Sequence, residues 1–291
     1  MLRRLLLAVG LFSTASVAFG AGLAFQRLAL HDYEDGPQIQ PGYEYLPGET
    51  VWFSARIAGY SRQVQDAESQ LDHVRLTWQI RPADASGTLI IPPLRGVIDE
   101  TLRPEDKDWV PKFLASFQVP PYAPRGVYKI PVLVRDEVSS AELSGQIEFR
   151  VRSEDDPAAD APFGVRNFRF LAKEDDRFAL RPPVFHQGAG LFARFEIIGY
   201  KLEGNNHFSV EYGLSILGPP TPEGESKPLF TQESAAADAG ESFYPQRWIL
   251  GGFGLNLDKD VPLGQHILVL TLRDKISGAA IELREPFEVR E

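Results

Sequence analysis

The chain has 291 residues, of which 43% are hydrophobic, and it carries a formal net charge of −10. This apolar content is enough for sizeable cores and excludes global disorder. The acidic balance, without clusters of Lys and Arg, argues against nucleic acid as a partner, because phosphate contacts need grouped cations. The chain contains no cysteine, which excludes disulfides, thiol chemistry and cysteine-based metal sites.

The first twenty residues have the layout of a signal peptide. Arg3 and Arg4 form a cationic head, residues 5–12 form an apolar run too short to span a bilayer, and Ala18 and Gly20 have cleavage-site spacing. No cysteine follows the run, which argues against a lipoprotein. We therefore predict that residues 1–20 are a signal peptide, that the mature chain has no membrane span, and that it is exported to the periplasm or the extracellular space.

The remaining chain contains an internal repeat. GETVWFSARIAGY (48–60) returns in altered form as GAGLFARFEIIGY (188–200). PRGVYKIPVLVRDEVSSAELSGQIEFRV (124–151) returns as PLGQHILVLTLRDKISGAAIELREPFEV (262–289). Two matches in the same order at nearly the same offset indicate two copies of one domain.

Short apolar runs between Gly, Pro, Asp and Ser clusters predict strands in both copies and no sustained helix. In the first copy we expect strands at 24–31, 50–58, 73–82, 87–91, 113–119, 126–136 and 143–152. In the second copy we expect them at 165–172, 189–199, 207–217, 227–231, 247–257, 264–274 and 281–290. About seven strands per copy are typical of a two-sheet sandwich. Residues 233–243 are rich in alanine without an apolar face, which predicts a long loop with at most one helical turn.

The segment between the copies, RSEDDPAADAPFG (152–164), is acidic, rich in Pro and Ala, and has no apolar stripe. These properties are typical of a linker. The sequence therefore predicts a signal peptide at 1–20, a β-sandwich domain at 21–152, an acidic Pro/Ala linker at 153–163 and a second β-sandwich domain at 164–291.

Two segments carry a family resemblance: YLPGETVWFSARIAGY (45–60) and PPYAPRGVYKIPVLVRD (120–136). Together they resemble bacterial immunoglobulin-like modules of the macroglobulin and fibronectin type III kinds. The resemblance implies an all-β protein with two tandem immunoglobulin-like antiparallel β-sandwich domains, and it does not carry a function. It also implies a tyrosine corner, in which the Tyr128 hydroxyl binds a nearby backbone group. His266 replaces this tyrosine in the second copy.

Signatures of catalysis are missing from the sequence. The five histidines show no zinc-binding spacing, and there is no Gly-x-Ser-x-Gly nucleophile elbow. The glycine-rich stretch 251–257 lacks the Lys-Ser/Thr of a phosphate-binding loop, so tight strand packing beside Trp248 and Phe253 explains it better. We therefore predict that the protein is not an enzyme and needs no cofactor.

Acidic residues gather at the linker and at the start of the second copy. Carboxylate oxygens are calcium ligands, so these residues are candidates for a calcium site at the joint between the copies. The candidate ligands are Asp155, Asp156, Asp175 and Asp176. A solvated acidic linker is the favoured alternative, because no calcium-binding loop motif accompanies them.

Trp109 is the one tryptophan in a predicted loop. If its side chain is exposed, it is a candidate to stack on a sugar or to anchor a partner. If its side chain is packed, it fixes the loop to its own domain, which is the favoured interpretation. The long loops at 61–72, 100–112 and 219–246 differ between the copies and are where such a fold carries specificity. We predict an exported, non-catalytic binding or scaffolding protein with a protein partner in the cell envelope or outside it. The alternatives are a carbohydrate-binding module and a calcium-stabilised adhesion-like module.

Overall fold

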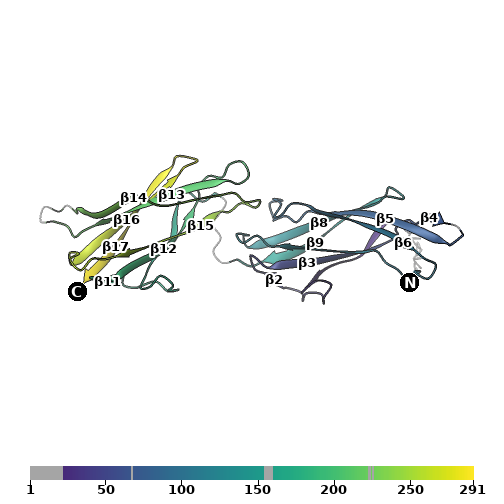
Figure 1. Ribbon diagram of the computed structural model, residues 1–291, viewed down its shortest axis with the longest axis horizontal. Coiled ribbons are helices and arrows are strands. Elements are labelled where there is room, and N and C mark those ends of the chain that lie inside the picture. The colour runs from purple at the N-terminus through teal and green to yellow at the C-terminus, as the bar shows by residue number, and fades with distance from the viewer. Residues whose placement is uncertain (1–21, 67, 154–159, 222–223, 225) are drawn as a thin grey trace, which may run out of the picture.

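The computed structural model describes residues 22–66, 68–153, 160–221, 224 and 226–291, and this part of the chain is all-β (Figure 1). The predicted signal peptide, Asp155 and Asp156 lie outside the described residues. A search of the described residues for a helix long and apolar enough to cross a membrane finds none.

Residues 24–151, here called the N-terminal half, form two sheets that share no strand with the rest of the chain. The smaller sheet has the order β1-β3-β7, with β1 at Ala24–His31, β3 at Thr50–Ala58 and β7 at Lys112–Gln118. The larger sheet has the order β2-β9-β8-β5-β4, and β6 also pairs with β5. Its strands are β2 (Glu44–Tyr45), β4 (Gln63–Asp66), β5 (Leu71–Ile80), β6 (Leu94–Leu102), β8 (Gly126–Asp136) and β9 (Glu142–Val151).

Residues 164–290, here called the C-terminal half, repeat this arrangement, and the two halves lie end to end (Figure 1). The smaller sheet has the order β10-β12-β15, with β10 at Gly164–Leu171, β12 at Gly190–Ile198 and β15 at Trp248–Asn256. The larger sheet has the order β11-β17-β16-β13-β14. Its strands are β11 (Val184–His186), β13 (Phe208–Leu217), β14 (Pro228–Gly240), β16 (Gly264–Asp274) and β17 (Ala280–Arg290).

The pairing within both halves is antiparallel except for one short strand in each, since β2 pairs parallel with β9 and β11 pairs parallel with β17. The core of the N-terminal half lies between its two sheets. Alternate residues of β3, among them Phe53 and Ile57, meet alternate residues of β8, among them Ile130 and Val134. The period of two in each strand therefore makes a sandwich, because it turns one apolar face of each sheet inward.

Most predicted strands are present, with ends shifted by no more than two residues. The strand predicted at 87–91 is wrong, because the Asp84 carboxylate accepts the Ser86 and Thr88 amides and closes a turn there. The strand of this region is β6, which the prediction missed. The loop predicted at 233–243 is also wrong, because β14 continues through its alanines to Gly240 in register with β13. The short strands β2, β4 and β11 add to the seven expected per copy.

Glycines in the strands make room for aromatic rings. A Cβ atom at Gly251 would lie 2.3 Å from the Phe195 ring, and one at Gly254 would lie 2.9 Å from the Phe192 ring. The glycine-rich stretch therefore serves strand packing, as predicted, although the rings that need the space are Phe195 and Phe192 rather than Trp248 and Phe253.

The tyrosine corner is confirmed in the N-terminal half. The Tyr128 hydroxyl donates to the Pro124 carbonyl oxygen at 2.7 Å, and the ring packs on Phe149 with a centroid distance of 5.3 Å. His266 takes the same place in the C-terminal half. Its Nδ1 contacts the Gly264 carbonyl oxygen at 3.0 Å, and its ring stacks on Phe287 at 5.3 Å. The second copy therefore keeps the ring packing and replaces the hydrogen bond.

Replacing Tyr128 with phenylalanine is expected to lower the free energy of unfolding by about 1 kcal/mol, because the ring stays and the bond to the Pro124 carbonyl is lost. Urea denaturation followed by tryptophan fluorescence measures the difference. A Tyr33→Phe variant is the control, because Tyr33 is 59% exposed. Equal stability of the two variants would show that the corner bond contributes nothing.

Candidate interaction surfaces

The joint between the two halves is built around Tyr244, from the segment that precedes β15. Tyr244 is 5% exposed and belongs to the hydrophobic core of the N-terminal half, although it comes from the C-terminal half. Its hydroxyl donates to the Asp84 carboxylate at 2.9 Å. Burial raises the pKa of Tyr244 far above its usual value, and the neighbouring Tyr128 and Asp84 add to the effect. The tyrosine is therefore a neutral donor that fixes the C-terminal half to the turn at Asp84.

A second aromatic contact supports the joint. The Tyr122 ring, in the loop before β8, meets the Trp248 ring edge-on at a centroid distance of 5.5 Å. Trp248 is the first residue of β15. The start of β15 therefore lies against the N-terminal half, while the rest of the strand runs away from it.

Trp109, the candidate residue for stacking on a sugar or anchoring a partner, lies against its own half. Its partly buried indole meets the Tyr60 ring edge-on at 5.7 Å, and its carbonyl oxygen accepts a hydrogen bond from the Tyr60 hydroxyl at 2.9 Å. The repeat places a similar contact in the C-terminal half, where the Tyr200 hydroxyl donates to the Gln246 carbonyl oxygen at 2.7 Å. The loop of Trp109 is thus held by a hydrogen bond that has an equivalent within the C-terminal half.

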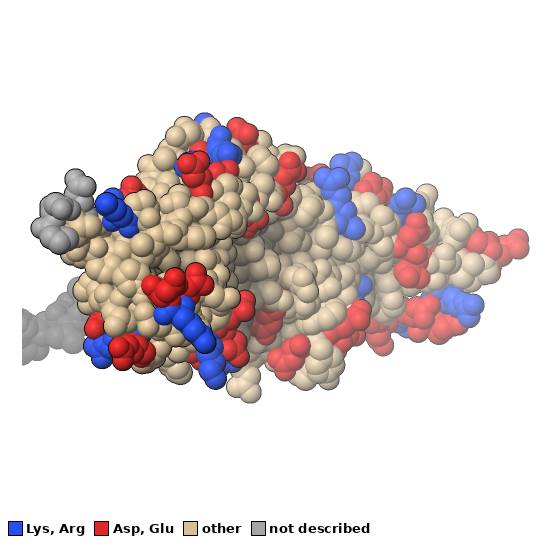
Figure 2. All heavy atoms as spheres, turned by 60° about the vertical axis from the view of Figure 1, so that its left-hand side comes forward, with Lys and Arg blue, Asp and Glu red and all other residues tan. Residues whose placement is uncertain are grey.

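The predicted calcium ligands do not come together in the part of the chain that the structure describes. Asp175 is exposed, and the Asp176 carboxylate accepts the Lys173 amide at 2.9 Å, which closes a turn. No group of three or more His, Asp or Glu among the described residues is arranged to hold a metal ion. Acidic and basic side chains are interspersed over the face seen in Figure 2.

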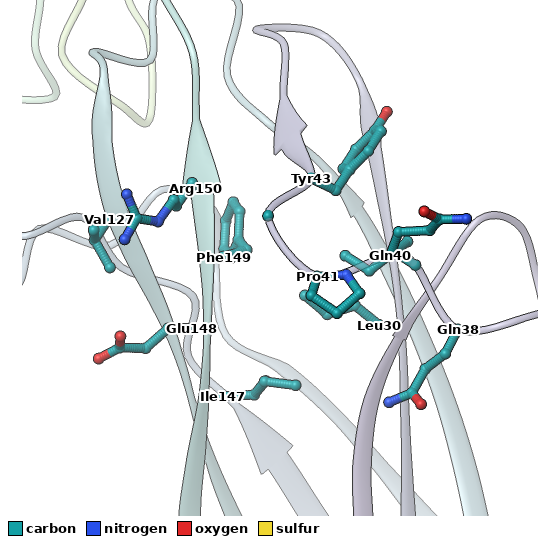
Figure 3. Close-up of a pocket in the computed structure, with 12 residues that line it drawn as sticks. Leu30, Gln38, Gln40, Pro41, Tyr43, Val127, Ile147, Glu148, Phe149 and Arg150 are labelled. Carbon is teal, nitrogen blue, oxygen red and sulfur yellow. The ribbon is translucent and has the colours of Figure 1, made fainter.

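A groove of about 380 Å³ lies in the N-terminal half between the segment before β2 and strand β9 (Figure 3). Pro41 and Gln40 face Ile147 and Phe149 across it. Tyr43 stands at one end, where its hydroxyl donates to the Glu49 carboxylate. That bond, with burial, raises the pKa of Tyr43 to about 12, so the tyrosine stays neutral. The groove therefore offers an apolar floor with a polar rim.

The sheet edges differ in how they are protected. An open edge strand presents unpaired N–H and C=O groups, and proteins blunt such edges with charges, prolines or bulges. Strands β1, β4, β10 and β14 each combine a charged residue with a register shift, and β6 carries several charges. Among the described edge strands longer than three residues, β15 alone has neither a charge nor a register shift.

The repeat gives β15 a protected counterpart in β7. Both strands are the free outer strand of their three-stranded sheet, and their pairings place Leu250 where β7 has Lys112. The Lys112 ammonium pairs with the Asp35 carboxylate. Leu250 is 60% exposed. The C-terminal half therefore lacks the lysine that blunts this edge in the N-terminal half.

No protein-family model matches this chain, and no curated protein matches it. Among solved structures, the chain is similar to a Pseudomonas fluorescens alkylpurine DNA glycosylase bound to DNA with an abasic-site analogue, at 11% identity and a TM-score of 0.31. That match covers 46% of this chain and 32% of the glycosylase chain.

Two streptococcal structures match over more of the chain. They are the C-terminal domain of the Streptococcus agalactiae antigen I/II polypeptide BspA and that of the Streptococcus pyogenes antigen I/II-family protein AspA. The first has 12% identity and the second 11%, both with a TM-score of 0.28, and they cover 91% and 92% of this chain and 99% of each domain. At these TM-scores neither the glycosylase nor the streptococcal domains carry a conclusion about this chain.

Proposed function

We propose that the protein is an exported, non-catalytic binding or scaffolding protein of the cell envelope or the extracellular space. It consists of two tandem immunoglobulin-like β-sandwich domains at 21–152 and 164–291, joined by the linker at 153–163. It acts through protein–protein contacts at a sheet edge. The observation that carries this proposal is the open, uncharged edge of β15, which contrasts with the charged edge of its counterpart β7 in the N-terminal half.

The edge of β15 suits recognition by strand addition. In this mode an added strand forms main-chain hydrogen bonds with the free edge, and the side chains beside the edge provide specificity. The Tyr244 joint fixes the start of β15 against the N-terminal half, so the edge is held on a firm support. Rigid support lowers the entropic cost of binding, because less of the surface must become ordered.

Photo-crosslinking in the cell tests the proposal. A photoreactive residue placed at Leu250 is expected to link the protein to another protein chain, whereas the same residue at Leu114 of β7 is not. The two positions are both exposed on edge strands, at 60% and 37%. Linked products from neither position, or from both equally, would contradict a binding role for the β15 edge. Mass spectrometry of the N-terminus and of cell fractions tests export and cleavage after residue 20 in the same cells.

A further inference from the structure

We propose that two copies of this chain pair antiparallel through β15, with Gly252 of each copy opposite Gly252 of the other. The two three-stranded β10-β12-β15 sheets then form one continuous sheet across the dimer. This inference rests on the proposed function, because it names the edge and the partner through which the protein binds.

The free backbone groups of β15 belong to its even-numbered residues. The amide of Leu257, just after the strand, donates to the Ala189 carbonyl at 2.9 Å, on the β12 side. The backbone N–H and C=O groups of successive residues point to opposite sides of an antiparallel strand. Those of the odd-numbered residues of β15 therefore point toward β12, and those of the even-numbered residues point toward the free edge. The Gly252 carbonyl accepts the Tyr212 hydroxyl at 2.7 Å and keeps a second lone pair. Within the described residues, the amides and carbonyls of Leu250 and Gly254 form no bond with another strand.

The side chains of β15 complement themselves in this register. A two-fold axis at Gly252 places Leu250 of one copy opposite Gly254 of the other. Gly254 has no side chain, and the Phe192 ring lies against it. The exposed Leu250 therefore finds an apolar surface formed by bare backbone and the edge of Phe192. The contact occurs twice because of the symmetry, and cross-strand pairs of this kind stabilise sheets.

The ends of β15 carry opposite charges in the same register. Arg247 precedes the strand and Asp258 follows it. In the antiparallel pair, Arg247 of one copy lies opposite Leu257 of the other and beside its Asp258. Neither residue has an ion pair within the described part of the chain. The strand itself is uncharged, so pairing brings no like charges together. A second copy therefore places an opposite charge near Arg247 at one end of the strand and near Asp258 at the other.

A single introduced cysteine tests the pairing and its register. The protein has no cysteine, so Gly252→Cys creates one thiol per chain, which symmetry brings opposite its own copy. Hydrogen-bonded antiparallel partners have Cα atoms about 5.5 Å apart, within the range that a disulfide spans. Mild oxidation is expected to link Gly252→Cys into a dimer and to leave the matched control, Leu114→Cys of β7, monomeric. A monomeric Gly252→Cys, or equal linking of both variants, overturns the inference.

Equilibrium sedimentation of the protein without cysteine provides the second test. Leu250→Lys restores the residue found in β7 and is expected to weaken dimerisation on the order of tenfold. Arg247→Asp is expected to weaken it as well, and Arg247→Asp combined with Asp258→Arg to restore it. Thermal unfolding shows whether each variant still folds. If the wild-type protein is monomeric at every concentration while Leu250 still crosslinks to a different protein in cells, the inference fails and the proposed function stands.

Discussion

Replacing Asp136 or Asp274 with alanine is expected to lower the free energy of unfolding by about 3 kcal/mol or more. Asp136 is 1% exposed, and its carboxylate accepts the amides of Ser61, Val138 and Ser139 at 2.7, 2.9 and 3.2 Å. The alanine variant leaves these buried donors without an acceptor, and each such loss costs free energy. Chemical denaturation measures the change, with Asp175→Ala as the control because that carboxylate is exposed.

Because of the repeat, the same loss of stability is expected in both halves. Asp274 is the counterpart of Asp136 in the second copy, is 2% exposed, and accepts the amides of Lys201, Ile276 and Ser277. In each half the carboxylate joins the end of one strand to the turn that follows it and to a distant loop. A loss of less than about 1 kcal/mol in both variants would show that water satisfies these donors and that the aspartates contribute little.

The same two carboxylates predict a loss of stability in acid. Burial opposes the ionisation of Asp136 and Asp274, but the hydrogen bonds to their charged forms outweigh it and lower both pKa values. Their stabilisation is therefore complete above the unfolded-state pKa of about 3.9 and is lost as the pH falls through the lower folded-state pKa. Unfolding free energies measured between pH 7 and pH 2 should fall less steeply for Asp136→Asn than for the wild-type protein.

Much of the fold follows from the repeat and from residue alternation, and the failures have physical causes. Strand β6 was missed because its Asp99 and Glu100 point to solvent and break the apolar pattern. The sequence of β14 predicts a loop because its alanines favour a helix but form no apolar face that a helix could bury. Pairing with β13 overrides that preference. In both cases backbone pairing stabilises a strand that its side chains do not indicate.

The sequence indicates less about the two candidate interaction sites, the edge of β15 and the joint at Tyr244, than about the fold. The sequence does carry the contrast between Lys112 and Leu250, because the offset that relates the second pair of matching segments also relates these two residues. Tyr244 had no such signal, because it lies in an unmatched loop and its partner Asp84 is 160 residues away. A contact that joins two folded halves is encoded by neither copy alone.

Replacing Tyr244 with alanine is expected to uncouple the two halves. The substitution removes a buried ring from the core of the N-terminal half, and comparable truncations cost about 3–5 kcal/mol. It also removes the donor to Asp84, which leaves the Tyr122–Trp248 contact to hold the joint. Calorimetry should therefore show one transition for the wild-type protein and two for Tyr244→Ala, with the N-terminal half melting first.

The conservative variant Tyr244→Phe separates the ring from its hydroxyl. It keeps the packing and loses the bond to Asp84, so it should cost about 1 kcal/mol and retain a single transition. Spin labels placed one in each half should give a broader distance distribution for Tyr244→Ala than for Tyr244→Phe. Equally narrow distributions would mean that the linker and the Tyr122–Trp248 contact hold the halves without Tyr244. In that case the edge of β15 would owe its position to the start of the strand at Trp248.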